Sequence, residues 1–191
     1  MLRSTLLVVS AFASSTLALV YGVDSSTLVS EATYAQAKSE GFTKAIIRGY
    51  EELCGMGGGV DPNFVGSYNN ARAAGITDID TYWFPCTGFN RSCKSYATQI
   101  AEILATFNAH SMKIGRIWIH IEKDRSCRNV RPNHFVQSVL TDDTSFQWNY
   151  RSAGNLAEAR KMITAIETSG YNYGIYSSPE VRQFVLFASA Y

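Results

Sequence analysis

Two carboxylates and a histidine stand where strand-like segments of the chain end. Asp24 closes a short apolar run, and His120 and Glu122 lie two residues apart at the end of the alternating segment 114–122. Side chains two positions apart in a strand share a face, so His120 and Glu122 point the same way. A carboxylic acid and a second negative or nucleophilic group across a sugar can cleave a glycosidic bond, and a glutamate among aromatic rings can be the acid. These residues are the first candidates for chemistry.

The same two-residue period adds side chains from neighbouring segments. Trp118 shares the face of His120 and Glu122, while the isoleucines between them take the other face, which suits packing under helices. The other sets that share a face are Asp80, Tyr82 and Phe84 in 78–84, and Ile46, Arg48 and Tyr50 in 45–50. If all of these faces point inward, one cavity holds the charged group of Asp24, Arg48, Asp80, His120 and Glu122. Buried charges are costly unless paired, so the group is either functional or a structural network around Arg48.

The elements that position these residues alternate between strands and helices. Strands are expected at 20–25, 45–50, 78–84, 114–122 and 173–177, and helices at 33–41, 62–75, 94–112 and 156–169. This order predicts an α/β fold with a parallel sheet and outer helices, either open or closed into a barrel. In parallel barrels the chemistry sits at the C-terminal ends of the strands, where Asp24 and Glu122 are expected.

Composition sets broad limits. The chain has 191 residues, the size of one domain, and a net charge of +1, which gives no bulk attraction to nucleic acid or to an acidic membrane. Eleven Tyr and three Trp suit an aromatic core, with some rings free to stack on sugars. We expect a monomer without a cofactor. The glycine-rich run 54–59 is interpreted as a loop rather than a phosphate cradle, and His110 and His134 as surface groups.

The first residues predict export. A positive start, an apolar run and a small-residue cleavage site make 1–18 a signal peptide rather than a membrane span, because polar sequence follows at once. We therefore expect a secreted, extracellular protein, or one of a lysosome or gut lumen.

The four cysteines agree with an oxidising compartment. The short loop from Cys86 to Cys93 favours a bridge between them, which leaves Cys54 for Cys127. No pair has the close spacing of a zinc knuckle, so we expect no metal. A glycosylation sequon at Asn90 lies inside the short loop, where a disulfide can prevent its use.

A series of short motifs resembles the family-25 glycoside hydrolase lysozymes. The motifs are YGVDSS at 21–26, RGYE at 48–51, VDPN at 60–63, DTYWFPC at 80–86, WIHIE at 118–122 and GIYSS at 174–178. The resemblance implies a modified (β/α) barrel of TIM type and N-acetylmuramidase activity on bacterial peptidoglycan. It also implies a catalytic aspartate at Asp24, an acid at Glu122, and sugar contacts by Tyr82 and Phe84. Asp80, Trp118 and Arg48 complete the expected substrate-binding set.

The chain departs from the family pattern in two ways. His120 stands where the family's Asp-x-Glu motif has its aspartate, and an imidazole supplies no negative charge to the reacting sugar. The family has further strands after the GIYSS strand, so we expect a domain over 19–191 with a C-terminally truncated barrel. Residues 130–147 form an atypical insertion and 181–191 an atypical tail, and both are compatible with translated introns.

Two function classes follow from these observations. One is a secreted muramidase that acts in antibacterial defence or digestion, with a rate impaired by His120 and by the truncation. The other is a non-catalytic relative that binds glycan or acts as an immune factor.

Overall fold

The fold is built on a parallel β-sheet. A computed structural model describes residues 20–53, 57–87, 92–122 and 151–177 of the chain. The parallel strands lie in the order β1 (Gly22–Ser25), β2 (Lys44–Glu51), β4 (Asp78–Trp83), β5 (Ile117–Ile121) and β6 (Tyr173–Ser177). A short strand, β3 (Gly59–Val60), pairs antiparallel with β2. The predicted α/β class is confirmed, whereas β3 falls in a stretch that was expected to be a loop.

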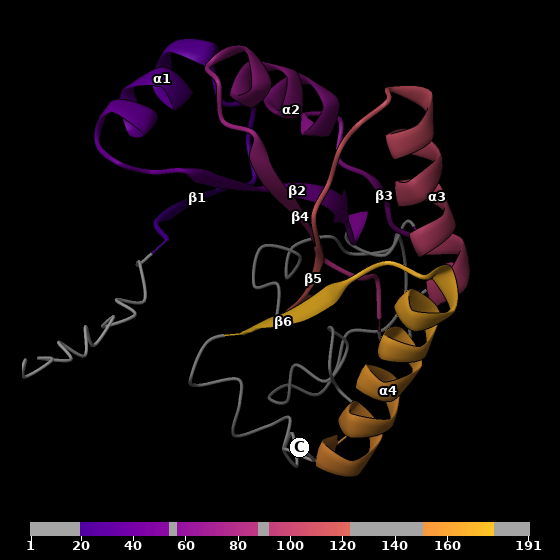
Figure 1. Cartoon of the computed structure of the whole chain (residues 1–191). Coiled ribbons are helices and arrows are strands. Elements are labelled where there is room, and N and C mark those ends of the chain that lie inside the picture. The colour runs from indigo at the N-terminus through magenta and orange to yellow at the C-terminus, as the bar shows by residue number, and fades with distance from the viewer. Residues whose placement is uncertain (1–19, 54–56, 88–91, 123–150, 178–191) are drawn as a thin grey trace, which may run out of the picture.

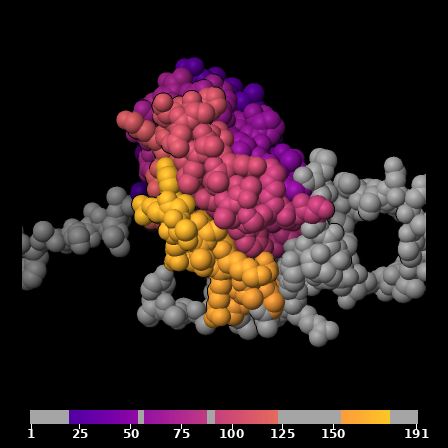
Figure 2. All heavy atoms as spheres, turned by 90° about the vertical axis from the view of Figure 1, so that its right-hand side faces the viewer, coloured from indigo at the N-terminus to yellow at the C-terminus, as the bar shows by residue number. Residues whose placement is uncertain are grey.

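Within the described ranges, four helices pack on the sheet in two pairs. They are α1 (Glu31–Ser39), α2 (Phe64–Ala73), α3 (Tyr96–Ala109) and α4 (Arg151–Ser169). The helices α1 and α2 lie together beside β1 and β2, and α3 and α4 lie side by side on the other flank (Figures 1 and 2). Ser30 and Ser95 cap α1 and α3 by accepting hydrogen bonds from the amides three residues later. None of the helices in the described ranges is long and apolar enough to cross a membrane.

The core lies between the helices and one face of the sheet. The strand residues that point into it are Ala45, Ile47, Ile79, Trp83, Ile117, Ile119 and Ile121. They meet helix side chains that include Tyr34, Phe64, Ile100, Ile103, Phe107, Met162 and Ile166. The prediction that the β5 isoleucines pack under helices is confirmed. The opposite sheet face is therefore free to carry the polar residues of the same strands.

The alternation breaks at Gly49. The pairing of β2 with β4 shifts register between Arg48 and Tyr50, which is the mark of a β-bulge. A bulge adds one residue and reverses the facing of those that follow. Tyr50 consequently enters the core and donates a hydrogen bond to Glu102 of α3 at 3.1 Å. The expectation that Tyr50 shares the face of Arg48 is wrong for this reason.

The sheet is strongly curled. The carboxylate of Asp24 on β1 interacts with Tyr176 of β6, although three strands lie between them in the sheet. Neighbouring strands are about 4.8 Å apart, so the outer strands of a flat sheet would be about 19 Å apart, beyond the reach of these side chains. The polar face is therefore concave. The predicted signal peptide, residues 130–147 and 181–191, the sequon at Asn90 and the predicted bridge between Cys54 and Cys127 lie outside the described residues.

Close packing between β5 and β6 gives a test of the curled sheet. A Cβ atom added at Gly174 would lie 2.5 Å from the ring of Trp118. We expect Gly174→Ala to lower the free energy of unfolding by about 1–3 kcal/mol, because the rigid indole must move. Urea denaturation measures this. Gly22→Ala is the control, since its Cβ would meet its nearest neighbour at an ordinary 3.5 Å. Equal stability of the two variants would contradict the packing.

Candidate active site

An imidazole ring lies at the centre of the concave face. His120 contacts Tyr82 and Phe84 of the β4 segment and Tyr176 of β6, with ring centroids 5.2, 4.9 and 4.9 Å away. Tyr82 and Tyr176 meet the imidazole edge to face, and Phe84 is tilted against it. The rings cover most of the imidazole, whose side chain is 15% exposed. The rings approach His120 from the β4 side and from the β6 side, because β5 lies between these two strands.

The hydrogen bonding of His120 defines its protonation. Its Nε2 lies 3.0 Å from Oε2 of Glu122, whereas its Nδ1 is buried without a partner among the described residues. A carboxylate only accepts hydrogen bonds, so a neutral ring beside it carries its proton on Nε2. Protonation of Nδ1 would then bury a donor that has no acceptor.

Burial decides the charge of this ring. The aromatic surroundings lower the pKa of His120, although the hydrogen bond and charge of Glu122 and the charge of Asp24 oppose that effect. The positive charge of Arg48 adds a smaller depression of the same pKa. His120 is thus a neutral imidazole at pH 7, in a position flanked by carboxylates.

The two candidate carboxylates are open to solvent. The side chain of Glu122 is 51% exposed and Asp24 is also exposed. The expectation that Glu122 is buried among aromatic side chains is wrong, because it is the last residue of its segment and projects beyond β5. The negative charge of Asp24, followed by burial, raises the pKa of Tyr176, so this phenol stays protonated at neutral pH. A ligand on the concave face can reach both carboxylates.

Arg48 forms a separate charged group. Its Nε pairs with buried Asp61, and its Nη2 lies 3.0 Å from Glu51. Burial raises the pKa of Glu51 despite the attraction of Arg48. The positive charge of Arg48 is thus already matched by two carboxylates. The structure bears out the interpretation of a network around Arg48, but its partners are Asp61 and Glu51.

Asp80 belongs to a third group, nearer the start of the strands. The buried carboxylate accepts hydrogen bonds from Lys44 at 3.0 Å and from the Trp118 indole at 2.9 Å. Lys44 also binds Asp78 at 2.6 Å. The five charged residues do not form a single group, because Asp80 and Arg48 each pair with other partners. Asp24, His120 and Glu122 are brought together.

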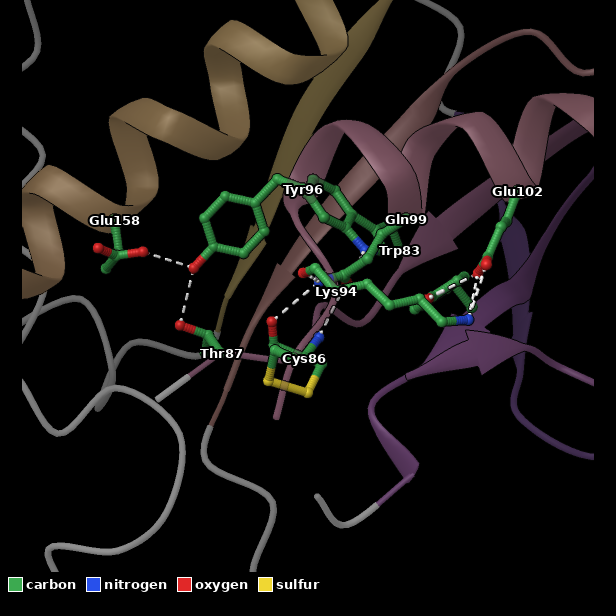
Figure 3. Close-up of a disulfide and its surroundings, with 10 residues drawn as sticks. Trp83, Cys86, Thr87, Lys94, Tyr96, Gln99, Glu102 and Glu158 are labelled. Carbon is green, nitrogen blue, oxygen red and sulfur yellow. Dashed lines mark hydrogen bonds and ion pairs between the residues drawn. A yellow bond between two sulfur atoms is a disulfide. The ribbon is translucent and has the colours of Figure 1, made fainter. Parts of the chain in front are cut away.

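A disulfide braces the chain beyond β4. Cys86 and Cys93 are bonded, with their Cα atoms 5.4 Å apart, so the predicted short-loop bridge is confirmed (Figure 3). Thr87, next to the bridge, hydrogen bonds at 2.9 Å with Tyr96, which donates to Glu158 of α4 at 2.6 Å. The loop that follows Phe84 is thereby tied to both α3 and α4.

Sequence reasoning missed three residues around the concave face. Tyr176 lies in the GIYSS motif, Asp61 in VDPN, and Lys44 continues the two-residue period of Ile46 and Arg48. All three residues lie in motifs or periods that the sequence shows, but no spacing rule predicts that β6 approaches β1.

The described residues hold no cluster of three or more metal-binding side chains.

Comparisons with known proteins place this geometry in a family. The sequence model of the family described as Lysozyme-like protein 1 matches residues 15–149. Lysozyme-like protein 5 of Caenorhabditis elegans is 31% identical over 82% of the chain. Probable GH family 25 lysozymes 2 and 4 of Dictyostelium discoideum are 29% and 30% identical over 83% and 82% of it. The chain spans about 60% of the length of these relatives.

A solved structure supports the fold. The modular autolysin LytC from Streptococcus pneumoniae superposes with a TM-score of 0.58 at 10% sequence identity. The match covers 85% of this chain and 33% of the autolysin. At this identity the likeness concerns the arrangement of strands and helices.

The buried imidazole makes stability depend on pH. Because burial lowers the pKa of His120 below the ordinary 6.5, unfolding takes up a proton as the pH falls below that value. The stabilisation is present above pH 6.5 and is lost as the pH drops toward the folded-state pKa. Urea unfolding of the parent and of His120→Asn, from about pH 7 to about pH 4, should give a flatter profile for the variant. Exposed His110, changed to Asn, is the control. Parallel profiles for the parent and His120→Asn would contradict this assignment.

Proposed function

The chain belongs to the family of lysozyme-like proteins related to the family-25 glycoside hydrolase lysozymes, and on this premise we propose that it cleaves bacterial peptidoglycan as a slow N-acetylmuramidase. The observation that carries the proposal is the pair of exposed carboxylates, Asp24 and Glu122, on a concave face lined by aromatic rings. Glycoside cleavage needs two such groups on either side of the bond that breaks.

Each residue takes a role that its surroundings support. Glu122 stands at the open end of β5 and donates the proton to the leaving sugar oxygen. Asp24, on β1, stabilises the positive charge that develops at the sugar, and its carboxylate interacts with Tyr176. The half-exposed ring of Tyr176 offers a flat surface for a sugar to stack on.

His120 explains the low rate. The family's motif places a negative charge at this position, and here a neutral imidazole is packed among three rings. Loss of one negative charge directed at the reacting carbon in a water-excluded site raises the activation barrier by about 3–4 kcal/mol, which lowers the rate a few hundredfold.

We propose that the protein is exported by its N-terminal segment 1–18 and serves in defence against bacteria or in their digestion.

A second candidate is a glycan-binding protein without catalysis. The hydrogen bond between His120 and Glu122 favours it, because the carboxylate that would act as acid already accepts a hydrogen bond from the imidazole. Binding would still use the aromatic concave face. Activity measurements on the variants below distinguish the two functions.

Removal of the proposed acid should abolish hydrolysis. Glu122→Gln keeps the shape of the side chain but cannot donate an acidic proton, so we expect wall-degrading activity to fall about 10²–10⁴-fold. Clearing of a suspension of bacterial cell walls measures it. Glu31→Gln, an exposed change in α1, is the matched control and should behave as the parent. Full activity in Glu122→Gln would refute the role of Glu122.

Restoring the family's charge should raise the rate. We expect His120→Asp to degrade cell walls about a hundredfold faster than the parent, because a carboxylate then faces the developing positive charge. His120→Asn is the matched control, since it is similar in size to aspartate but uncharged. A parent as active as His120→Asp would show that His120 is no defect. Binding of glycan without hydrolysis in all three proteins would favour the second candidate.

A further inference from the structure

The buried side-chain amide of Gln99, on α3, binds the chain before and after Phe84, whose ring packs on His120. The side chain of Gln99 is fully buried, and its Oε1 accepts hydrogen bonds from the Trp83 indole at 3.0 Å and from the Cys86 amide at 3.1 Å. Its Nε2 donates to the carbonyl oxygens of Cys86 at 3.1 Å and Lys94 at 2.9 Å (Figure 3). Every hydrogen-bonding position of the amide is filled.

The residues that Gln99 holds are placed around the site. Only Phe84 and Pro85 lie between Trp83 and Cys86, and the ring of Phe84 packs on His120 at 4.9 Å. The amide of Phe84 donates to the carbonyl of Tyr50 at 3.1 Å, which fixes the same segment from β2. The contact with Lys94 secures the other end of the disulfide loop, next to Cys93. Gln99 itself contacts none of the rings around the imidazole in these hydrogen bonds.

We propose that Gln99 is the positioning residue of this site, which holds Phe84 against His120 by clamping the chain before and after it. A buried amide with all its hydrogen bonds satisfied fixes one geometry, because any shift leaves a buried polar group unpaired. The disulfide closes the loop, but its own bond does not restrain Trp83. Gln99 does both.

The proposal predicts a change at His120 when Gln99 is replaced. Gln99→Met has nearly the same length but makes none of the four hydrogen bonds, so Phe84 moves and water reaches the imidazole. Because burial lowers the pKa of His120, its NMR titration midpoint should shift upward, toward the ordinary 6.5. The chain has three histidines, and the signal of His120 is identified by its loss in His120→Asn. The rate of cell-wall degradation should also fall in Gln99→Met, and this second readout rests on the proposed function.

The control separates positioning from loss of stability. Tyr68→Phe removes a hydrogen bond that the Tyr68 hydroxyl accepts from the Lys113 amide at 2.8 Å, on α2 and away from the rings around His120. It should lower stability and leave the His120 midpoint unchanged. If Gln99→Met does not fold, Gln99→Asn decides, because it keeps an uncharged amide that is one methylene too short to reach all four partners, and it should give a smaller upward shift.

The outcomes are distinct. An upward shift in a Gln99 variant that Tyr68→Phe lacks supports the proposal. A midpoint equal to the parent's in a folded Gln99 variant overturns it and leaves Gln99 a structural residue only. A parent without wall-degrading activity would contradict the proposed function, whereas the titration would still test Gln99.

Discussion

The interaction between Tyr176 and the carboxylate of Asp24 connects the first and last described strands of the parallel sheet across its concave side. It can form only because the sheet curls, and the curl brings the ends of β1, β4, β5 and β6 around one space. Residues that are far apart in sequence then meet His120 from several directions. Helices on the convex side supply the apolar burial that maintains the curl.

Polar groups on the concave face are satisfied in layers. Near the start of the strands, the buried carboxylate of Asp80 is matched by Lys44 and the Trp118 indole. Farther along, Arg48 is matched by Asp61 and Glu51. Within each of these groups the opposite charges pair with each other, because an unpaired buried charge is costly. Asp24 and Glu122, at the open end, are left exposed to a ligand.

The sequence predicted the elements and much of the facing, because strand period and helix capping are local. It located the five parallel strands, the helix-facing isoleucines of β5 and the Cys86–Cys93 bridge. It failed at Tyr50, since a bulge at Gly49 reverses the period in a way that residue types do not announce. It did not predict the partners of Asp80 and Arg48, because pairing depends on which oppositely charged residue is nearer in space. The roles of Asp24 and Glu122 came from motif resemblance and stay predictions.

Gln99 illustrates what lay beyond sequence reasoning. A glutamine in the first turns of an amphipathic helix has no sequence signature, and only the path of the chain after β4 gives it partners. Its hydrogen bonds connect the disulfide loop to the segment that carries Phe84, whose ring packs on His120, so the proposed positioning acts through a buried amide that a ligand need not touch.

The proposed muramidase activity is tested most directly by identifying the new reducing sugar ends that the parent protein produces in purified peptidoglycan. Prolonged digestion followed by borohydride reduction and sugar analysis identifies the new reducing ends. We expect reduced N-acetylmuramic acid to appear slowly. New ends of N-acetylglucosamine alone, or no new reducing ends after prolonged digestion, would contradict it.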